Sequence, residues 1–181
     1  MSGVGVRDAT PEDARAIAHV RTRTWQVAYA HVFTAEQLGT ISEERSAEDW
    51  NRWLSDPSSR SQTIVADGPE GVVGFASFGP ARAEDGEPIG ELYAIYALPE
   101  ASGAGVGQAL MRDVLDRLRA GGFEEAILWV LEDNPRTRRF YERAGWRADG
   151  SAKEEEWLGT RVREIRYRIV LVPRGGDGGA E

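Results

Sequence analysis

The feature that most constrains the fold is a glycine-rich turn between an apolar segment and a helical one. Gly103, Gly105 and Gly107 follow the strand-like segment Gly90–Leu98 and lead into the helical pattern of Val106–Ala120. Glycine adopts backbone conformations that other residues avoid and lets the main chain approach a ligand closely. Amides at the start of a helix point outward, where the helix dipole favours an anion. We therefore predict a phosphate-binding strand–turn–helix unit, with a plain glycine turn as the alternative.

Two familiar phosphate-binding motifs do not fit this turn. A P-loop requires Gly-Lys followed by Ser or Thr, whereas Gly107 is followed by Gln108 and Ala109. The dinucleotide-binding pattern G-x-G-x-x-G requires a third glycine, and that position falls on Gln108 or Leu110. The remaining candidate among phosphate-binding turns is a coenzyme A pyrophosphate loop.

The rest of the chain predicts a single α+β domain over residues 1–172. Apolar segments bounded by turn residues indicate strands at 4–8, 62–66, 72–78, 90–98 and 126–131, and alternation indicates one at 162–172. Helical spacing indicates helices at 10–29, 42–54, 106–120 and 135–144. This order favours a mixed, mostly antiparallel sheet with helices on its faces. Residues 173–181 contain only one apolar residue, Ala180, and are expected to form a disordered tail.

Composition argues against several classes of protein. The 181-residue chain has a formal net charge of −8, which disfavours a nucleic-acid binder because such proteins must neutralise phosphates. No apolar run approaches the roughly 18 residues of a membrane-spanning helix, and Met1–Asp8 lacks the pattern of a signal peptide. We therefore expect a cytoplasmic protein without a membrane partner. The absence of cysteine excludes disulfides and a cysteine nucleophile.

Two segments resemble the GNAT superfamily of N-acetyltransferases. The family's coenzyme A motif, Gln/Arg-x-x-Gly-x-Gly/Ala, matches the chain at Gly105 and Gly107, with Ser102 at the Gln/Arg position. Further along, Asn134–Trp146 is similar to the family block N-x-x-x-x-x-F-Y-E-x-x-G-F, with Trp for the last Phe. The two segments occur in the family's order with a predicted strand between them. The resemblance extends from residue 4 to about residue 172 and is loosest in the N-terminal half, where the chain reads R-x-A-x-x-x-D over residues 7–13.

The resemblance implies a bacterial enzyme that moves the acetyl group of acetyl-CoA to a primary amine of a small molecule or peptide. Transfer would be direct, within a ternary complex and without a metal, and family members often form homodimers. It also implies a splayed strand pair that admits the pantetheine arm of the coenzyme. The residues implied to contact the coenzyme are Ile95, Tyr96, Ala97, Ser102, Gly103, Ala104, Gly105, Val106, Gly107, Gln108, Asn134 and Tyr141.

For catalysis, the resemblance implies a base and an acid. Glu91 lies fourteen residues before Gly105, where some family members have a general base; the alternatives are a solvated glutamate at a strand end and a chain of water molecules. Tyr141 matches the tyrosine proposed as proton donor to the leaving thiolate, and the alternative is a core aromatic residue. Asn134 could also be simply the N-cap of the helix that begins at Pro135.

The acceptor is the least constrained part of the prediction. Trp25 and Tyr29 are four residues apart on one helical face, and the resemblance places the first helices at the acceptor pocket; core packing is the alternative. His19, His31 and the single lysine, Lys153, are assigned no role. The alternative function is a GNAT-like module that senses acyl-CoA without turnover, which the Ser102 departure favours. A nucleotide-binding protein of another fold is weaker, because the P-loop and dinucleotide patterns fail.

Overall fold

The computed structural model describes residues 4–82 and 89–171 of the chain. Its centre is a seven-stranded sheet with the order β1-β2-β3-β4-β5-β7-β6. The strands are β1 (Gly5–Asp8), β2 (Gln62–Gly68), β3 (Gly71–Pro80), β4 (Ile89–Ala97), β5 (Glu125–Leu131), β6 (Arg147–Trp157) and β7 (Thr160–Val170). Every neighbouring pair is antiparallel except β4 with β5, which is parallel. The predicted mostly antiparallel α+β fold is confirmed.

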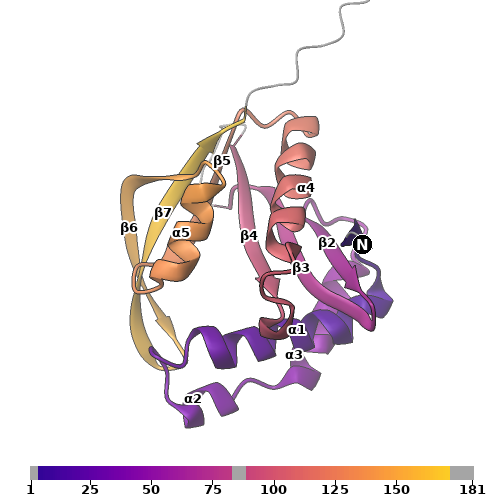
Figure 1. Ribbon diagram of the computed structural model, residues 1–181, viewed down its shortest axis with the longest axis vertical. Helices are drawn as coiled ribbons and strands as arrows, with labels where there is room; N and C mark the ends of the chain where they lie inside the picture. Colours follow the sequence, from indigo (N-terminus) through magenta and orange to yellow (C-terminus); the bar gives the residue numbers. More distant parts are fainter. Residues whose placement is uncertain (1–3, 83–88, 172–181) are drawn as a thin grey trace, which may run out of the picture.

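Helices cover both faces of the sheet (Figure 1). They are α1 (Ala14–Ala28), α2 (Ala35–Gly39), α3 (Glu43–Leu54), α4 (Val106–Ala120) and α5 (Pro135–Arg143), with 3-10 turns at Pro11–Asp13 and Pro99–Ala101. The helix predicted to start at Thr10 therefore begins as a 3-10 turn, and the short helix α2 was not predicted. The tail predicted for residues 173–181 lies outside the described residues, as does residue 172.

The period-two alternation of β2 and β3 sends side chains into two separate cores. Ile64 and Ala76 pack with the apolar face of α4, whereas Val65 and Phe75 pack with α1 and with Trp50 of α3. Successive strand residues point to opposite faces, so both faces of these strands are buried. This explains why β2 and β3 read as nearly continuous apolar runs.

The sheet opens between β4 and β5. The two strands pair at only three positions, Ile89 with Glu125, Gly90 with Ala126 and Glu91 with Ile127. On its other side β4 stays paired with β3 as far as Ala97, with a bulge where Tyr93 has no partner. A bulge bends the strand that contains it, so β4 diverges from β5 beyond Glu91. Figure 1 shows this gap, and it confirms the predicted splayed strand pair.

The C-terminal part of the sheet corrects the sequence-based prediction. The prediction had one last strand over residues 162–172, whereas the structure has a hairpin of β6 and β7 that turns at Leu158 and Gly159. Both turn residues have positive φ values, 49° and 77°, as a type I′ turn requires. Strand β6 was missed because it is an edge strand with mostly exposed charged residues, so it shows no apolar alternation. Its pairing with β7 determines its conformation.

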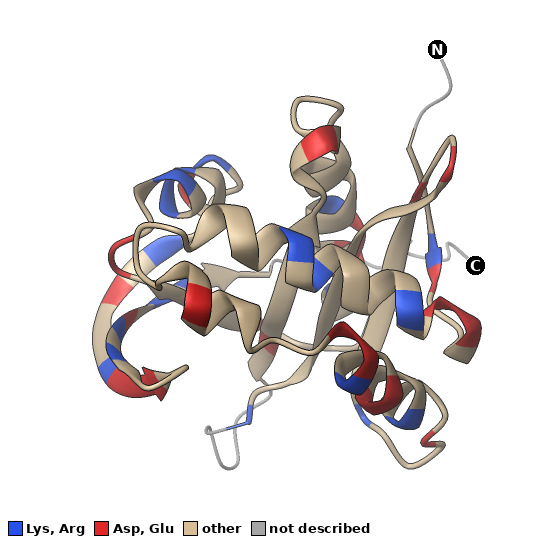
Figure 2. Ribbon diagram, turned by 90° about the horizontal axis from the view of Figure 1, so that it is seen from below, with Lys and Arg blue, Asp and Glu red and all other residues tan. Residues whose placement is uncertain are grey.

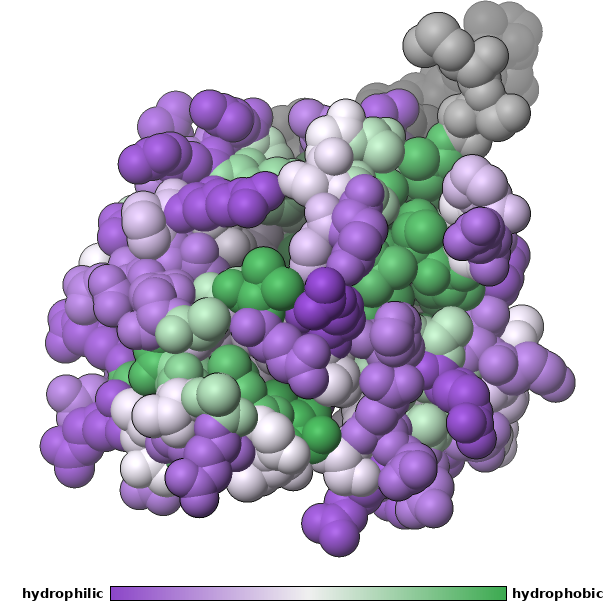
Figure 3. All heavy atoms as spheres, turned by 60° about the horizontal axis from the view of Figure 1, so that its bottom comes forward, coloured by the Kyte–Doolittle hydropathy of each residue, from purple (hydrophilic) through white to green (hydrophobic). Residues whose placement is uncertain are grey.

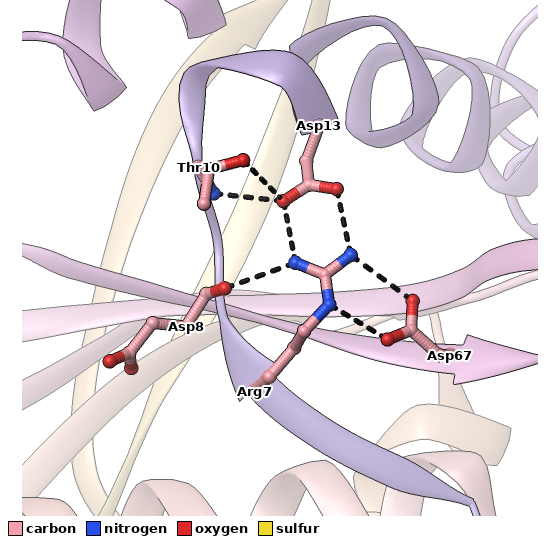
Figure 4. A network of polar contacts seen from close by, with 5 residues as sticks. All are labelled: Arg7, Asp8, Thr10, Asp13 and Asp67. Atoms are coloured by element: carbon pink, nitrogen blue, oxygen red, sulfur yellow. Dashed lines mark hydrogen bonds and ion pairs between the residues drawn. The ribbon is translucent and has the colours of Figure 1, made fainter.

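An ion-pair network fixes the start of the chain on the sheet (Figure 4). Arg7 of β1 donates to both carboxylate oxygens of Asp13, at 2.8 and 2.9 Å, and to Asp67 of β2 at 2.8 Å. Asp13 also accepts from the backbone N–H of Thr10 at 2.8 Å. The R-x-A-x-x-x-D pattern of residues 7–13 therefore joins β1, the 3-10 turn and β2. These contacts determine where α1 begins.

Charged residues of both signs are interspersed over the surface seen from below the sheet (Figure 2). Helix α1 contributes arginines and no acidic residue, whereas α3 begins with Glu43 and Glu44. Among the described helices, none combines the length and the apolar character that a membrane span requires. Charges of both signs are thus present along the described elements in this view.

Candidate active site

A cleft of about 1870 Å³ opens where β4 and β5 separate. Its walls come from α1 and α3, from the segment between α3 and β2, from β4 and β5, from the 3-10 turn that precedes the glycine loop, from α5 and from the β6–β7 hairpin. Figure 3 turns the side at the bottom of Figure 1 forward and shows hydrophobic patches among hydrophilic side chains. The cleft therefore brings together elements from the whole chain, and both apolar and charged groups line it.

The glycine turn has the backbone that its sequence predicts. Gly103 and Gly105 have φ values of 86° and 79°, in the left-handed region that favours glycine. Gly105 is the N-cap of α4, and a methyl group at Gly103 would meet no atom within 4 Å. At Gly107 a methyl group would lie 3.3 Å from the ring of Phe140, so α4 and α5 approach closely there. The turn leaves open space beside the N-terminus of α4, which fits an anionic group.

The side chains of this loop differ in what they can offer a ligand. Ser102, Ala104 and Gln108 are exposed, whereas Val106, the first residue of α4, is buried in the core. Val106 can therefore contribute only its backbone. The backbone amides, rather than side chains, are the groups that the loop presents at the helix N-terminus.

Arg136, which the sequence-based prediction did not include, lies at Ser102. It is the second residue of α5, and its Nη2 donates to Oγ of Ser102 at 3.0 Å. Ser102 stands where the family motif has Gln or Arg, so a guanidinium from a different element is present at the loop. No short-range pattern in the sequence indicates this contact, because 34 residues separate the partners.

The predicted strand residues Ile95, Tyr96 and Ala97 border the cleft. All three pair with β3, and none of them pairs with β5 among the described residues. The carbonyl oxygen of Ala97 accepts from Thr24 Oγ1 of α1 at 3.1 Å, which ties α1 to this end of β4. One edge of β4 is thus open to the cleft over the segment that the prediction assigned to the pantetheine arm.

Tyr141 is in the core and at the cleft at once. Its side chain is 7% exposed and packs with Trp146 and Tyr167, at centroid distances of 6.4 and 6.3 Å. Its hydroxyl makes no hydrogen bond within the described part of the chain, and the residue lines the cleft. Burial raises the pKa of Tyr141 well above its ordinary value, so the hydroxyl stays protonated at neutral pH. Both interpretations of Tyr141, core aromatic and proton donor, are compatible with this position.

Glu91 is buried rather than solvated at a strand end. It is 2% exposed, and Arg82 holds it through three donors. The backbone N–H of Arg82 donates to Oε2 at 2.9 Å, and its Nη2 and Nε donate to Oε1 at 2.5 and 3.2 Å. The Arg82 guanidinium also lies 4.7 Å from the ring centroid of Tyr93. To accept a proton from a substrate, the Glu91 carboxylate would have to give up part of this pairing.

The predicted acceptor residues form an aromatic wall. Trp25 and Tyr29 are both 8% exposed, line the cleft and contact each other at a centroid distance of 4.9 Å. Trp25 also stacks on Trp157 of β6 at 5.3 Å and donates to the Tyr96 hydroxyl at 3.2 Å. These residues pack as a cluster and border the cleft, so the two interpretations of them are compatible.

Asn134 is the N-cap of α5, as the alternative interpretation expected. Its side-chain oxygen accepts from the backbone N–H of Thr137 at 3.2 Å. It is buried and lines the cleft. His31, which was assigned no role, contacts the carbonyl oxygen of Asp133 at 2.7 Å, and this contact joins the segment after α1 to the loop before α5.

A second pair of charged residues at the cleft was also missed. Glu164 of β7 lies in register with Leu131 of β5 and with Lys153 of β6. Lys153 Nζ is 3.3 Å from Glu164 Oε2 and 4.7 Å from the ring centroid of Trp129. Prediction of this pair required the β6–β7 hairpin, which the sequence does not show by alternation. Within the part of the chain that the structure describes, no group of three or more His, Cys, Asp or Glu residues is arranged to hold a metal ion.

Comparison with known proteins agrees with this architecture. A family model described as the acetyltransferase (GNAT) family matches residues 17–146. An uncharacterised N-acetyltransferase of Bacillus subtilis, YuaI, is 35% identical over 132 residues, which are 73% of this chain and 74% of that protein. A mycothiol acetyltransferase of Frankia casuarinae is 45% identical over 67 residues, 37% of this chain but only 19% of that longer protein.

Solved structures show the same fold. The PaiA N-acetyltransferase of Thermoplasma acidophilum, solved in complex with coenzyme A, superposes with a TM-score of 0.74 at 18% identity. The alignment covers 94% of this chain and 99% of that one. The splayed sheet and the helices around it are therefore an arrangement that known proteins share.

Proposed function

The chain belongs to the acetyltransferase (GNAT) family, and from this premise we propose that it transfers acetyl from acetyl-CoA to a primary amine of a small molecule or peptide. The observation that supports the proposal most is the gap between β4 and β5, which leads to the open N-terminus of α4. One site thus offers an extended strand edge and an anion-binding helix terminus. A thioester linked through pantetheine to a pyrophosphate requires both.

The glycine loop and Arg136 are proposed to hold the pyrophosphate. The amides of residues 103–108 supply hydrogen-bond donors at the helix N-terminus, where an anion is favoured. Arg136 adds a cation within hydrogen-bond distance of Ser102. We infer that Arg136 replaces the charge or amide that the family motif usually places at position 102. A guanidinium suits this task because it binds phosphate oxygens through two parallel hydrogen bonds.

The open edge of β4 is proposed to position the thioester. The N–H of Leu98 donates to Val73 of β3, and backbone groups of successive strand residues point to alternate edges. Ile95 and Ala97 therefore direct theirs to the open edge, where the pantetheine amides would pair, and Tyr96 borders the cleft. A backbone N–H of this edge would donate to the acetyl carbonyl oxygen, where negative charge develops during attack by the amine. Removal of one such donor in a studied protease costs about 2.7 to 4 kcal/mol. Asn134, at the N-cap of α5, also lines the cleft.

The chemistry proposed is direct transfer. Acetyl-CoA supplies the acetyl group as a thioester, and the chain has no cysteine on which an acyl intermediate could form. Tyr141 would donate its hydroxyl proton toward the leaving sulfur, since it is protonated, faces the cleft and has no partner among the described residues. Trp25 and Tyr29 would form the apolar wall against which the acceptor lies. Glu91 remains a predicted base, with its carboxylate held by Arg82.

Thiol release from acetyl-CoA across a panel of primary amines tests this function. Amino acids, polyamines, aminoglycosides and peptides with free N-termini form the panel, and mass spectrometry identifies the product. We expect thiol release with at least one amine, in equal amount to N-acetylated product. Binding of coenzyme A without thiol release on any amine would contradict the enzyme and favour a sensor of acyl-CoA.

The role of Arg136 has a separate test in coenzyme binding. Arg136→Ala is expected to weaken coenzyme A binding roughly tenfold, the size of one charge-assisted contact of about 1.4 kcal/mol at an exposed site. Arg139→Ala is the matched control, because Arg139 is exposed on the same helix and contacts neither Ser102 nor the loop. Calorimetry measures both dissociation constants. Equal affinities of the two variants would contradict the assignment of Arg136.

A further inference from the structure

Glu164 occupies a distinct position among the carboxylates of the cleft. It lies in the middle of β7, with Leu131 of β5 on one side and Lys153 of β6 on the other. Leu131 is the last residue of β5, so Glu164 stands where the gap between β4 and β5 has opened. It is only 6% exposed, and it lines the cleft. A glutamate so deeply buried is rare unless it is paired or functional.

Glu164 and Tyr141 approach the cleft from opposite faces of the sheet. Directly opposed residues on neighbouring strands share a face, so Glu164 shares the face of Leu131, which packs with Trp25 and Tyr29 of α1. Tyr141 belongs to the core on the other face, with α4 and Tyr167. An amine that arrives along the α1 side would therefore meet Glu164, and a thiolate that leaves on the α5 side would meet Tyr141.

Tyr29 borders the same cleft as these two groups. Its pKa is raised well above the ordinary value, chiefly by burial and further by the neighbouring Tyr96, Tyr141 and Glu164. Tyr29, Tyr141 and Glu164 all line the cleft. Tyr29 itself stays protonated and forms part of the cleft wall.

The partners of Glu164 leave it able to accept a proton. Its ion pair is a single contact with Lys153 at 3.3 Å, and Lys153 is shared with Glu155 at 3.1 Å. Glu91, by contrast, accepts three hydrogen bonds from Arg82, one of them from the backbone. To take a proton, Glu91 would have to give up one of these three contacts, whereas Glu164 has only the contact with the shared Lys153 to give up.

The charges that act on Glu164 come from several elements. Lys153 and Glu155 lie on β6, Tyr29 is the C-cap of α1, and Arg82 lies two residues after β3. Burial is the largest effect and raises the pKa of Glu164, Lys153 and Arg82 lower it, and Glu155 raises it again. The net direction is upward, toward the pH at which a general base works best.

We propose that Glu164 is the general base that deprotonates the acceptor ammonium, an inference that rests on the acetyltransferase function proposed above. The ammonium of the acceptor gives one proton to the Glu164 carboxylate, which later releases it to solvent. The free amine nitrogen forms a bond to the acetyl carbon, and the carbon–sulfur bond breaks. Sulfur takes the proton of the Tyr141 hydroxyl, and the second proton of the nitrogen restores that hydroxyl. The products are the amide, the free thiol and one proton.

Glu164→Gln, compared with Glu91→Gln, tests the proposal through the pH dependence of kcat/KM. We expect Glu164→Gln to lower kcat/KM at neutral pH by about 10²- to 10⁴-fold, the usual contribution of a general base. Because only free amine can then react, the remaining activity should rise tenfold per pH unit up to the pKa of the acceptor. Wild type should instead reach a plateau near neutral pH, and the pH profile of Glu91→Gln decides between the two carboxylates. Coenzyme A affinity should be equal in all three proteins.

Stability gives a readout that does not depend on activity. Since burial raises the pKa of Glu164 in the folded state, the folded form is favoured when this carboxyl is protonated, and that advantage is lost as pH rises through the raised pKa. Glu164→Gln is therefore expected to be at least as stable as wild type at pH 8 and equal to it at pH 4. Failure of the variant to fold, or a lower melting temperature at pH 8, would show a structural ion pair and overturn the proposal.

The outcomes separate this inference from the proposed function. Wild-type activity on an amine together with full activity of Glu164→Gln overturns the base assignment alone. If Glu91→Gln instead loses activity at neutral pH and regains it tenfold per pH unit, the base is Glu91, and the assignment of Glu164 is overturned. A wild type that binds coenzyme A and acetylates no amine of the panel contradicts the proposed function itself.

Discussion

Tyr141→Phe separates stability, coenzyme binding and turnover, because the substitution removes one oxygen atom and leaves the ring. The ring keeps its neighbours Phe140, Trp146 and Tyr167, at centroid distances of 5.5, 6.4 and 6.3 Å. The hydroxyl has no hydrogen-bond partner among the described residues. The free energy of unfolding should therefore change by less than about 1 kcal/mol, since no internal hydrogen bond is lost.

Turnover should respond in a different way. If the hydroxyl gives its proton to the leaving sulfur, its loss should lower kcat by about 10²- to 10⁴-fold. This range corresponds to about 2.7 to 5.5 kcal/mol of transition-state stabilisation, at 1.36 kcal/mol per factor of ten. The dissociation constant of coenzyme A should stay near the wild-type value. Steady-state thiol release measures kcat, calorimetry measures affinity and denaturant titration measures stability.

Tyr167→Phe is the matched control. Tyr167 lies in the same core, but its hydroxyl donates to Glu142 at 2.8 Å and accepts from Arg138 at 3.2 Å. Its loss should cost about 1–3 kcal/mol of stability, because two charged partners lose a hydrogen bond, while kcat stays close to wild type. Equal loss of turnover and coenzyme affinity in Tyr141→Phe, or unchanged turnover, would refute the assignment of Tyr141 as the acid.

Two further predictions concern the fold around the site. Arg7 holds the pKa of Asp13 below its ordinary value, so the stability that this pair contributes is present above about pH 4 and is lost as pH falls through the lowered pKa. Asp13→Asn should then cost about 1–3 kcal/mol at pH 7 and less as the pH falls below about 4; a cost that does not change with pH would contradict the pairing. Gly105→Ala should cost about 1–2 kcal/mol for its φ of 79° and also weaken coenzyme A binding. Gly122→Ala, with a φ of 83° at the other end of α4, should show the same strain and unchanged binding.

The elements that the sequence predicts well are those with local signals. Helix α4 has the predicted bounds because Gly105 begins it and Gly121 ends it, and both signals lie within the segment itself. The positions of the first five strands along the chain follow from apolar segments and from the turn residues between them. Strand β6 has no such signal. It lies at the edge of the sheet and is mostly exposed, so its sequence is rich in charged residues and shows no apolar pattern.

The site shows the same division. The glycine loop, the open edge of β4 and Tyr141 come together at the cleft as the resemblance implies. Arg136, which contacts Ser102, and Glu164, which pairs with Lys153, depend on contacts between distant segments. The partners in these contacts are far apart in the sequence, so no short sequence pattern predicts that they meet. The burial of Glu91 against Arg82 is likewise a consequence of tertiary packing.

Hydrogen–deuterium exchange with and without coenzyme A tests the central claim most directly, that the gap between β4 and β5 and the glycine loop hold the acetyl donor. The account predicts that coenzyme A slows exchange of backbone amides in residues 92–97 and 102–108. Exchange of the backbone amides that pair β1 with β2, at one edge of the sheet, should not change. Protection at a different surface, with the amides of β4 and of the loop unaffected, would contradict the account.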